Sequence, residues 1–285
     1  MMEVFDPRPC DLGDGALWHP KRRQLFWFDI VNGRLLSRSG DEALEWDLGE
    51  MASAAGWVDE GTLLIATETA LKRFDIATGA LESVAPLEAD DSLTRSNDGR
   101  ADPRGGFWIG TMGKEAESRA GALYRFHGGE VRRLRAGITI PNAICFAPDG
   151  GTAYWTDTAD GIVHAQRLDP DGWPGGEAVP LIDFRGTGLN PDGAVTDAEG
   201  NLWIAQWGAE RVACHGPDGR FRRAVTLGAM HPSCPAFGGE GLSTLYVTTA
   251  RQGLEPGEID RRPENGGVFR LDGVGPGRPE PRVVL

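Results

Sequence analysis

The segment FWIGT (Phe107–Thr111) is one of six short apolar segments that recur along the chain and decide its fold. The other five are LFWFD (Leu25–Asp29), LLIAT (Leu63–Thr67), AYWTD (Ala153–Asp157), LWIAQ (Leu202–Gln206) and LYVTT (Leu245–Thr249). Their aromatic, Val and Thr residues suit β-strands. A repeat of roughly 40 to 50 residues with several strands per unit is typical of β-propellers.

Six such units use the whole chain, so the sequence predicts an all-β, six-bladed β-propeller that forms a single domain over residues 1–285. Turn-forming runs such as Pro148-Asp149-Gly150 separate the strands. Few helices are expected, because no long apolar stripe has the helical period of 3.6 residues. The ring is expected to close by pairing an end segment, such as Glu3-Val4-Phe5, with the last unit.

The formal net charge of −13 argues against a nucleic acid or an anionic membrane as partner, because both attract basic surfaces. The start of the chain lacks the apolar core of a signal peptide, so a cytoplasmic protein is expected, and nothing indicates an obligate protein partner. The cysteines lack paired spacing, which favours free buried thiols over disulfides. They are Cys10, Cys145, Cys214 and Cys234.

Polar side chains recur at one phase of the repeat, 11 or 12 residues before the second residue of each apolar segment. The six residues at this phase are Asp14, Ser53, Asn97, Asn142, Asp192 and Cys234. A position kept in register in every unit lies around a common axis, so two carboxylates and two carboxamides should converge there. Oxygen donors of this kind suit Ca²⁺, Mg²⁺ or Mn²⁺. Turn chemistry is the alternative for any one of them alone, and the agreement of four favours a functional site.

Several motifs in chain order resemble the gluconolactonase/regucalcin (senescence marker protein) family over nearly the full length. The motifs are Leu12 to Trp18, Arg95-Ser96-Asn97-Asp98-Gly99, Pro141-Asn142, Pro191-Asp192-Gly193, Cys234-Pro235-Ala236-Phe237-Gly238-Gly239 and Leu245 to Arg251. The resemblance implies a six-bladed propeller with one divalent metal in its central channel. It also implies a role in carbohydrate metabolism, as a hydrolase that opens sugar lactones to aldonic acids.

Carried over by position, the resemblance implies that Asn142 and Asp192 are metal ligands, that Arg95 binds substrate oxygens, and that Asn97 contacts the substrate or water at the metal. The family's first ligand is a glutamate in an L-G-E-G motif, and Asp14 stands there in this chain. Its side chain is shorter by about 1.5 Å. Two arrangements remain open: the metal shifts toward the first blade, or a water bridges the gap. Ca²⁺ is the expected metal, with Zn²⁺, Mn²⁺ or Fe²⁺ as alternatives.

The expected activity is therefore metal-dependent hydrolysis of a sugar lactone, with Asp192 as ligand and general base and with Arg95 and Asn97 binding the substrate. The sequence contains no GxSxG motif, so it gives no sign of a serine nucleophile of that kind. The alternatives are a propeller without catalysis, which binds calcium or other proteins, and a hydrolase that resembles phosphotriesterases. The polar loop 113–121 is either a lid or a solvated loop. Trp207 offers either a ring face for a sugar or a core side chain.

Overall fold

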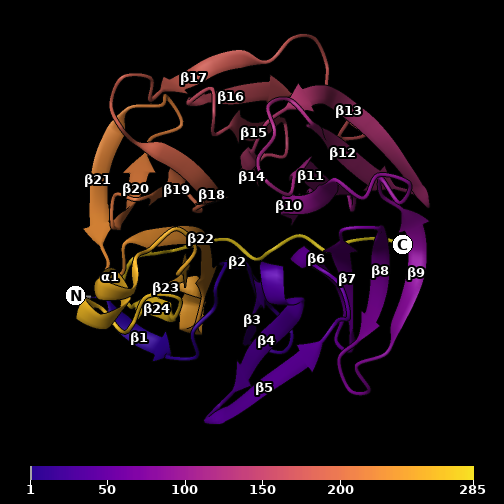
Figure 1. Ribbon diagram of the computed structural model, residues 1–285. Coiled ribbons are helices and arrows are strands. Elements are labelled where there is room, and N and C mark those ends of the chain that lie inside the picture. Colours follow the sequence, from indigo (N-terminus) through magenta and orange to yellow (C-terminus); the bar gives the residue numbers. More distant parts are fainter. Residues whose placement is uncertain (1) are drawn as a thin grey trace.

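The computed structural model describes residues 2–285, which form six four-stranded antiparallel sheets arranged as blades around a central axis (Figure 1). The predicted six-bladed all-β propeller is confirmed. Helical structure within the described residues is limited to the 3₁₀ turns η1 (Ile30–Asn32) and η2 (Glu240–Leu242) and the short helix α1 (Pro256–Arg261). The last of these lies in a segment, 252–265, whose charged and Pro-containing sequence suggests a plain surface loop.

Each blade runs from an inner strand at the axis to an outer strand at the rim. Blade 1 contains β2 (Gly13–His19), β3 (Gln24–Asp29), β4 (Arg34–Ser39) and β5 (Glu42–Asp47), and blade 2 contains β6 (Ala52–Asp59), β7 (Thr62–Thr67), β8 (Ala70–Asp75) and β9 (Leu81–Pro86). Blade 3 contains β10 (Thr94–Ala101), β11 (Phe107–Gly113), β12 (Gly121–His127) and β13 (Glu130–Ile138).

Blade 4 contains β14 (Pro141–Phe146), β15 (Thr152–Asp157), β16 (Ile162–Arg167) and β17 (Val179–Asp183), and blade 5 contains β18 (Asn190–Thr196), β19 (Leu202–Trp207), β20 (Arg211–His215) and β21 (Phe221–Thr226). Blade 6 contains β22 (His231–Gly238), β23 (Thr244–Ala250), β24 (Val268–Leu271) and, at its rim, β1 (Glu3–Asp6).

The six apolar segments of the repeat are the second strands of the blades. Their second residues are all buried, from 0% exposed at Trp108 to 6% at Tyr246. Each such side chain adds to the apolar packing of the ring, and complete burial of one stabilises the fold by roughly 1.5–3 kcal/mol. The repeat therefore recurs because each blade needs a large apolar residue at the same place.

The ring closes through the N-terminus, as predicted. Strand β1 pairs antiparallel with β24, and Glu3 lies opposite Arg270 and Val4 opposite Phe269. The Phe5 ring packs edge-on against the Tyr246 ring, with 4.9 Å between the ring centres. Because the first residues complete the last blade, separation of blade 6 from blade 1 would expose apolar surface on both.

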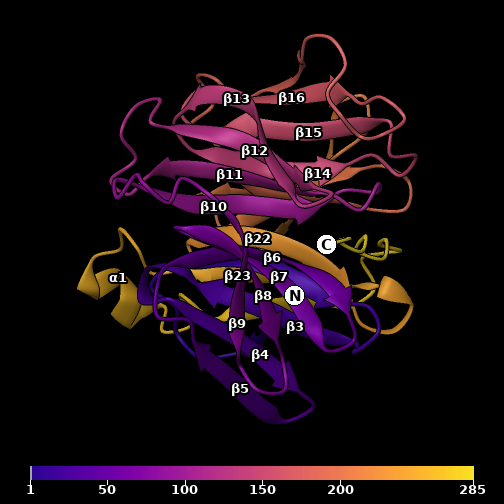
Figure 2. The same cartoon turned by 90° about the vertical axis from the view of Figure 1, so that its right-hand side faces the viewer.

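The two faces of the ring differ. In Figure 2, α1 lies on one side and the C-terminal segment, which runs on from β24 without further regular structure, lies on the other. All four cysteines are free and buried, as predicted. No helix within residues 2–285 is long and apolar enough to cross a membrane.

Aspartates in the turns before the second strands secure some blades internally. In blade 3, Asp102 accepts hydrogen bonds from the backbone N–H groups of Arg104 and Gly106, at 2.7 and 3.1 Å. Its other oxygen accepts a hydrogen bond of 2.7 Å from Nε of Arg125, and both side chains are fully buried. The Arg125 guanidinium also lies 4.3 Å from the centre of the Trp173 ring. Asp102 is thus the anionic partner of a buried cation.

We expect Asp102→Ala to lower the free energy of unfolding by about 3–5 kcal/mol, because it leaves the buried charge of Arg125 without a partner. Urea titration followed by tryptophan fluorescence measures the change. Asp149→Ala is the matched control, since Asp149 occupies the turn of the next blade but is exposed and bonds only the N–H of Gly151. Its expected cost is below about 1 kcal/mol, and equal losses in both variants would contradict the assignment.

Candidate active site

Every inner strand carries a β-bulge at the position of the recurring polar residues. In blade 4 the register with β15 passes from Asn142 opposite Thr156 to Cys145 opposite Tyr154, so β14 holds one extra residue. The same single-residue shift occurs in the other five blades. A bulge breaks the strict alternation of a strand and redirects side chains. The bulge in each blade is therefore what turns this phase of the repeat toward the channel.

The side chains that the sequence predicts for the site do line one cavity. This cavity has a volume of about 510 Å³. Its lining includes Asp14, Arg95, Asn97, Asn142 and Asp192, which come from the inner strands of blades 1, 3, 4 and 5. All five are between 4% and 6% exposed. The structure thus brings the predicted residues together, while their roles stay predictions.

A chain of hydrogen bonds holds the amide side chains of the cavity in place. Nη1 of Arg95 donates to Oδ1 of Asn97 at 2.9 Å, and Nδ2 of Asn97 donates to Oδ1 of Asn142 at 3.0 Å. Nδ2 of Asn142 in turn donates to Oγ1 of Thr158 at 2.9 Å. Each carboxamide oxygen accepts one of these hydrogen bonds and keeps a second lone pair for a further contact.

The two carboxylates are in an environment that opposes their charge. Burial raises the pKa of Asp14 to about 7, and the charge of Asp98 adds to the effect. Burial likewise raises the pKa of Asp192 well above its ordinary value, with a further contribution from Asp14. Burial also lowers the pKa of Arg95, whose guanidinium is close enough to Asp14 and Asp192 for their charges to oppose that shift. The site therefore concentrates negative charge that a bound cation would compensate.

Asp98 is a member of this charge cluster that the sequence analysis missed as a site residue. It is 3% exposed, its Oδ2 accepts a hydrogen bond of 2.7 Å from the N–H of Ile144, and burial raises its pKa to about 6. Strand alternation places Asp98 on the face opposite Asn97. The bulge after Ser96 removes that alternation, and the Asn-Asp-Gly sequence was the available signal.

The donor chemistry of the cavity fits a hard divalent cation. Carboxylate and carboxamide oxygens are the ligands that Ca²⁺ prefers. No group of three His, Cys, Asp or Glu side chains within residues 2–285 is spaced to hold a metal by itself. A cation here would therefore use the mixed set of Asp14, Asn142 and Asp192, with open positions left for water or substrate.

The remaining two residues of the polar phase do not line the cavity. Ser53 donates a hydrogen bond of 2.7 Å to Oγ of Ser96, and Cys234 lies buried with its Sγ 3.9 Å from Nη2 of Arg100. Burial raises the pKa of Cys234 well above its ordinary value, so the thiol stays protonated. These two positions contribute packing rather than ligands.

A second phase of the repeat also supplies cavity residues. Met112, Thr158 and Trp207 all line the cavity, and each stands four residues after the aromatic second residue of its apolar segment. This constant spacing of four residues is a signal that the sequence itself carries. Trp207 is half-buried, and its ring stacks on the His231 ring with 4.3 Å between ring centres. It both lines the cavity and packs against the hydrophobic core.

The polar loop 113–121 borders the same cavity through Lys114, Glu115 and Ala116. Lys114 forms an ion pair of 2.5 Å with Glu68 of blade 2, which ties the start of the loop to a neighbouring blade. Ala116 has a φ of 57°, in the left-handed region that is uncommon for residues other than glycine. The position of the loop agrees with a lid, and whether it moves stays a prediction.

Comparison with known proteins gives matches over nearly the whole chain. Residues 12–251 match the family described as SMP-30/Gluconolactonase/LRE-like region. The chain is 40% identical to a putative sugar lactone lactonase of Rhizobium meliloti, over 96% of this chain and 94% of the relative, and 35% identical to an L-arabinolactonase of Azospirillum brasilense, over 90% and 87%.

Among solved structures, a calcium-binding protein of Agrobacterium tumefaciens called regucalcin superposes with a TM-score of 0.98 at 38% identity, and the match covers 100% of this chain and 98% of that one. A luciferin-regenerating enzyme superposes with a TM-score of 0.92 at 24% identity, which shows the shared fold. The motifs, the six blades and the match over residues 12–251 together show that the chain belongs to the SMP-30/gluconolactonase/LRE-like family.

Proposed function

We propose that this protein is a metal-dependent sugar lactonase, which hydrolyses an aldonolactone to the aldonic acid. The observation that carries the proposal is the convergence of Asp14, Asp192, Asn142, Asn97 and Arg95 on one cavity of about 510 Å³. A cavity of that size accommodates a monosaccharide lactone. The names of two relatives of the protein, sugar lactone lactonase and L-arabinolactonase, support the same substrate class.

Asp14, Asn142 and Asp192 would hold the divalent cation, for which Ca²⁺ suits the oxygen donors best and Zn²⁺, Mn²⁺ or Fe²⁺ are alternatives. When bound, such a cation acts as a Lewis acid on a carbonyl and stabilises developing negative charge. The protein's own part is to supply two carboxylates that balance the charge and a carboxamide that adds a neutral oxygen. Asn97 fixes the carboxamide of Asn142 through the hydrogen bond of 3.0 Å.

The remaining steps belong to side chains of the chain itself. Asp192 accepts the proton of the attacking water and later returns it to the ring oxygen that leaves as a hydroxyl. Arg95 donates hydrogen bonds to substrate oxygens, because its guanidinium carries more N–H groups than the contacts to Asn97 and the carbonyl of Ser96 use. Asn97 keeps the substrate in register with Asp192. Trp207 offers an apolar ring face to the carbon skeleton of the sugar.

A propeller that binds calcium without catalysis is the second candidate, because a structural neighbour at 38% identity is named a calcium-binding protein. An arginine inside the cavity favours the lactonase, since a binding site for a cation alone gains nothing from a buried positive charge beside it. A phosphotriesterase-like hydrolase would use the same groups on another ester.

A cytoplasmic location and the absence of nucleic-acid, membrane and obligate protein partners remain part of the proposal.

A panel of lactones with and without chelator tests the proposal. We expect hydrolysis of at least one of gluconolactone, xylonolactone, arabinonolactone and galactonolactone, loss of activity after treatment with EDTA, and recovery on addition of Ca²⁺, Mn²⁺, Zn²⁺ or Fe²⁺. Full activity in a preparation shown to be metal-free would contradict metal dependence. Binding of Ca²⁺ with no hydrolysis would favour a propeller that binds calcium without catalysis. Hydrolysis of a phosphotriester but of no lactone would favour the phosphotriesterase-like hydrolase.

Asp14 tests the ligand set. We expect Asp14→Glu to bind the cation more tightly, because the longer side chain spans the roughly 1.5 Å that aspartate lacks. Asp14→Ala should weaken binding less than Asp192→Ala does. Titration of Ca²⁺ into each variant measures the affinities. An equal loss in both alanine variants would show that Asp14 ligates directly despite its length.

Asp192→Asn separates ligation from proton transfer, because the amide keeps one oxygen but loses the charge and the basicity. The cation should still bind, more weakly, while kcat falls by about 10²–10⁴-fold, as is typical after loss of a general base. The measurement is kcat at saturating metal, with occupancy determined separately. Near-normal turnover in the fully loaded variant would leave Asp192 as a ligand only.

A further inference from the structure

The C-terminal segment crosses the face of the ring opposite the cavity. We call residues 274–284 the strap. Figure 1 shows it in yellow across the centre of the ring, and Figure 2 shows it on the side away from α1. All inner strands run in one direction, so residues at their starts, such as Asp192, lie at one mouth of the channel. Residues at their ends, such as Arg100, lie at the other mouth, beneath the strap.

Backbone hydrogen bonds attach the strap to successive blades. Its first residue, Val274, donates to the carbonyl of Ser243 in the last blade, at 2.9 Å. The N–H of Ala198 in the fifth blade donates to the carbonyl of Pro276 at 3.0 Å. At its far end, Val283 donates to the carbonyl of Trp57 in the second blade at 2.9 Å. The strap therefore spans the ring in one fixed register.

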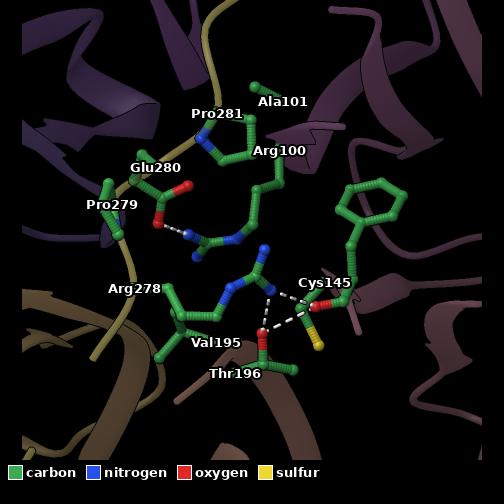
Figure 3. A pocket seen from close by; sticks show the side chains of 10 residues that line it. Arg100, Ala101, Cys145, Val195, Thr196, Arg278, Pro279, Glu280 and Pro281 are labelled. Atoms are coloured by element: carbon green, nitrogen blue, oxygen red, sulfur yellow. Dashed lines mark hydrogen bonds and ion pairs between the residues drawn. The ribbon is translucent and has the colours of Figure 1, made fainter. Parts of the chain in front are cut away.

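This register inserts one carboxylate into the channel. Glu280 forms an ion pair with Arg100 of β10, as Figure 3 shows, and both residues are 6% exposed. Within residues 2–285 it is the one ion-pair partner that Arg100 has. The small cavity beside the pair has a volume of about 20 Å³, so little solvent screens these charges. Arg100 is thus a buried cation whose counterion comes from the last residues of the chain.

Arg100 also lies against the underside of the candidate site. Its Nε donates to the carbonyl of Ile144 at 3.2 Å, and the N–H of the same residue donates to Asp98 at 2.7 Å. The charge of Arg100 lowers the pKa of Asp98 and of Asp14, against the larger effect of burial. Arg100 therefore competes, by charge, with any other cation that these carboxylates could bind.

We propose that Glu280 is a positioning residue of the cation site: it neutralises Arg100 from the opposite face of the ring and so leaves the charge of Asp98, Asp14 and Asp192 to a divalent cation. The inference rests on the proposed function, because it concerns the same cation site. It explains why a buried ion pair stands on the channel, where an apolar pair of similar volume would pack at no loss of stability.

The size of the effect follows from Coulomb's law. At an effective dielectric constant of about 20, one unit charge at roughly 10 Å changes the affinity for a charged ligand on the order of tenfold, and a divalent ligand feels it more strongly. Loss of the Glu280 charge should therefore weaken cation binding by at least about tenfold. Loss of both charges of the pair should leave the affinity almost unchanged, because the two changes cancel.

Calorimetric titration with Ca²⁺ tests the inference on four full-length proteins: the wild type, Glu280→Gln, the double variant Arg100→Met with Glu280→Leu, and Arg278→Lys. Arg278→Lys is the matched control, because lysine keeps the positive charge but removes the guanidinium that attaches the strap. Nη1 of Arg278 donates to the carbonyl of Phe146 at 2.9 Å and to Oγ1 of Thr196 at 3.1 Å, and Figure 3 shows Arg278 beside Thr196. We expect binding at least about tenfold weaker in Glu280→Gln and affinities near that of the wild type in the other two variants.

Each contrary result has a distinct meaning. Wild-type affinity in Glu280→Gln would overturn the inference. A double variant as weak as Glu280→Gln, or an equally weak Arg278→Lys, would show that strap packing rather than charge supports the site, and would overturn the inference as well. A wild type that binds none of Ca²⁺, Mn²⁺, Zn²⁺ and Fe²⁺ would refute the cation site of the proposed function itself. If Glu280→Gln fails to fold, Arg100→Gln replaces it in the test. At pH 8, the Arg100→Gln variant must then bind Ca²⁺ more tightly than the wild type does at the same pH.

Discussion

One extra residue in each inner strand is the constraint on which the rest of the site depends. The bulge interrupts the alternation of the strand at the same phase in all six blades, just where the channel mouth begins. It turns Asp14, Asn142 and Asp192 toward one cavity. The second strands bury a large apolar side chain each and hold the blades in register, so the positions of the channel residues follow from the packing of the ring.

The channel balances its buried charges from two sides. On the cavity side, Asp14 and Asp192 lie near the guanidinium of Arg95, and burial raises the pKa of both carboxyls. On the strap side, Arg100 and Glu280 form a neutral pair. Burial makes each of these charges expensive, so the residues that stand at the channel are those whose charges another group, or a bound cation, compensates.

The repeat in the sequence was sufficient to predict the blades, the N-terminal closure and the convergence of Asp14 and Asp192, because these follow from a position kept in register around a closed ring. Asp98 was missed because strict alternation places it away from Asn97, and its connection to the site is the effect of its buried charge on Asp14 and Asp192. The pairing of Arg100 with Glu280 joins residues 180 apart in sequence. It depends on the path of the strap, which the repeat in the sequence does not predict. The single-domain assignment stays a prediction.

Anomalous diffraction from crystals soaked in Mn²⁺ tests the central claim most directly, since it locates a cation without reference to activity. The account predicts one strong peak in the cavity, within about 2.0–2.6 Å of oxygens of Asp192 and Asn142. The peak should lie beside the amide side chains of Asn97 and Asn142, which are hydrogen-bonded to each other. A cavity without a peak in crystals shown to contain Mn²⁺, or a peak bound only by surface carboxylates, would contradict it.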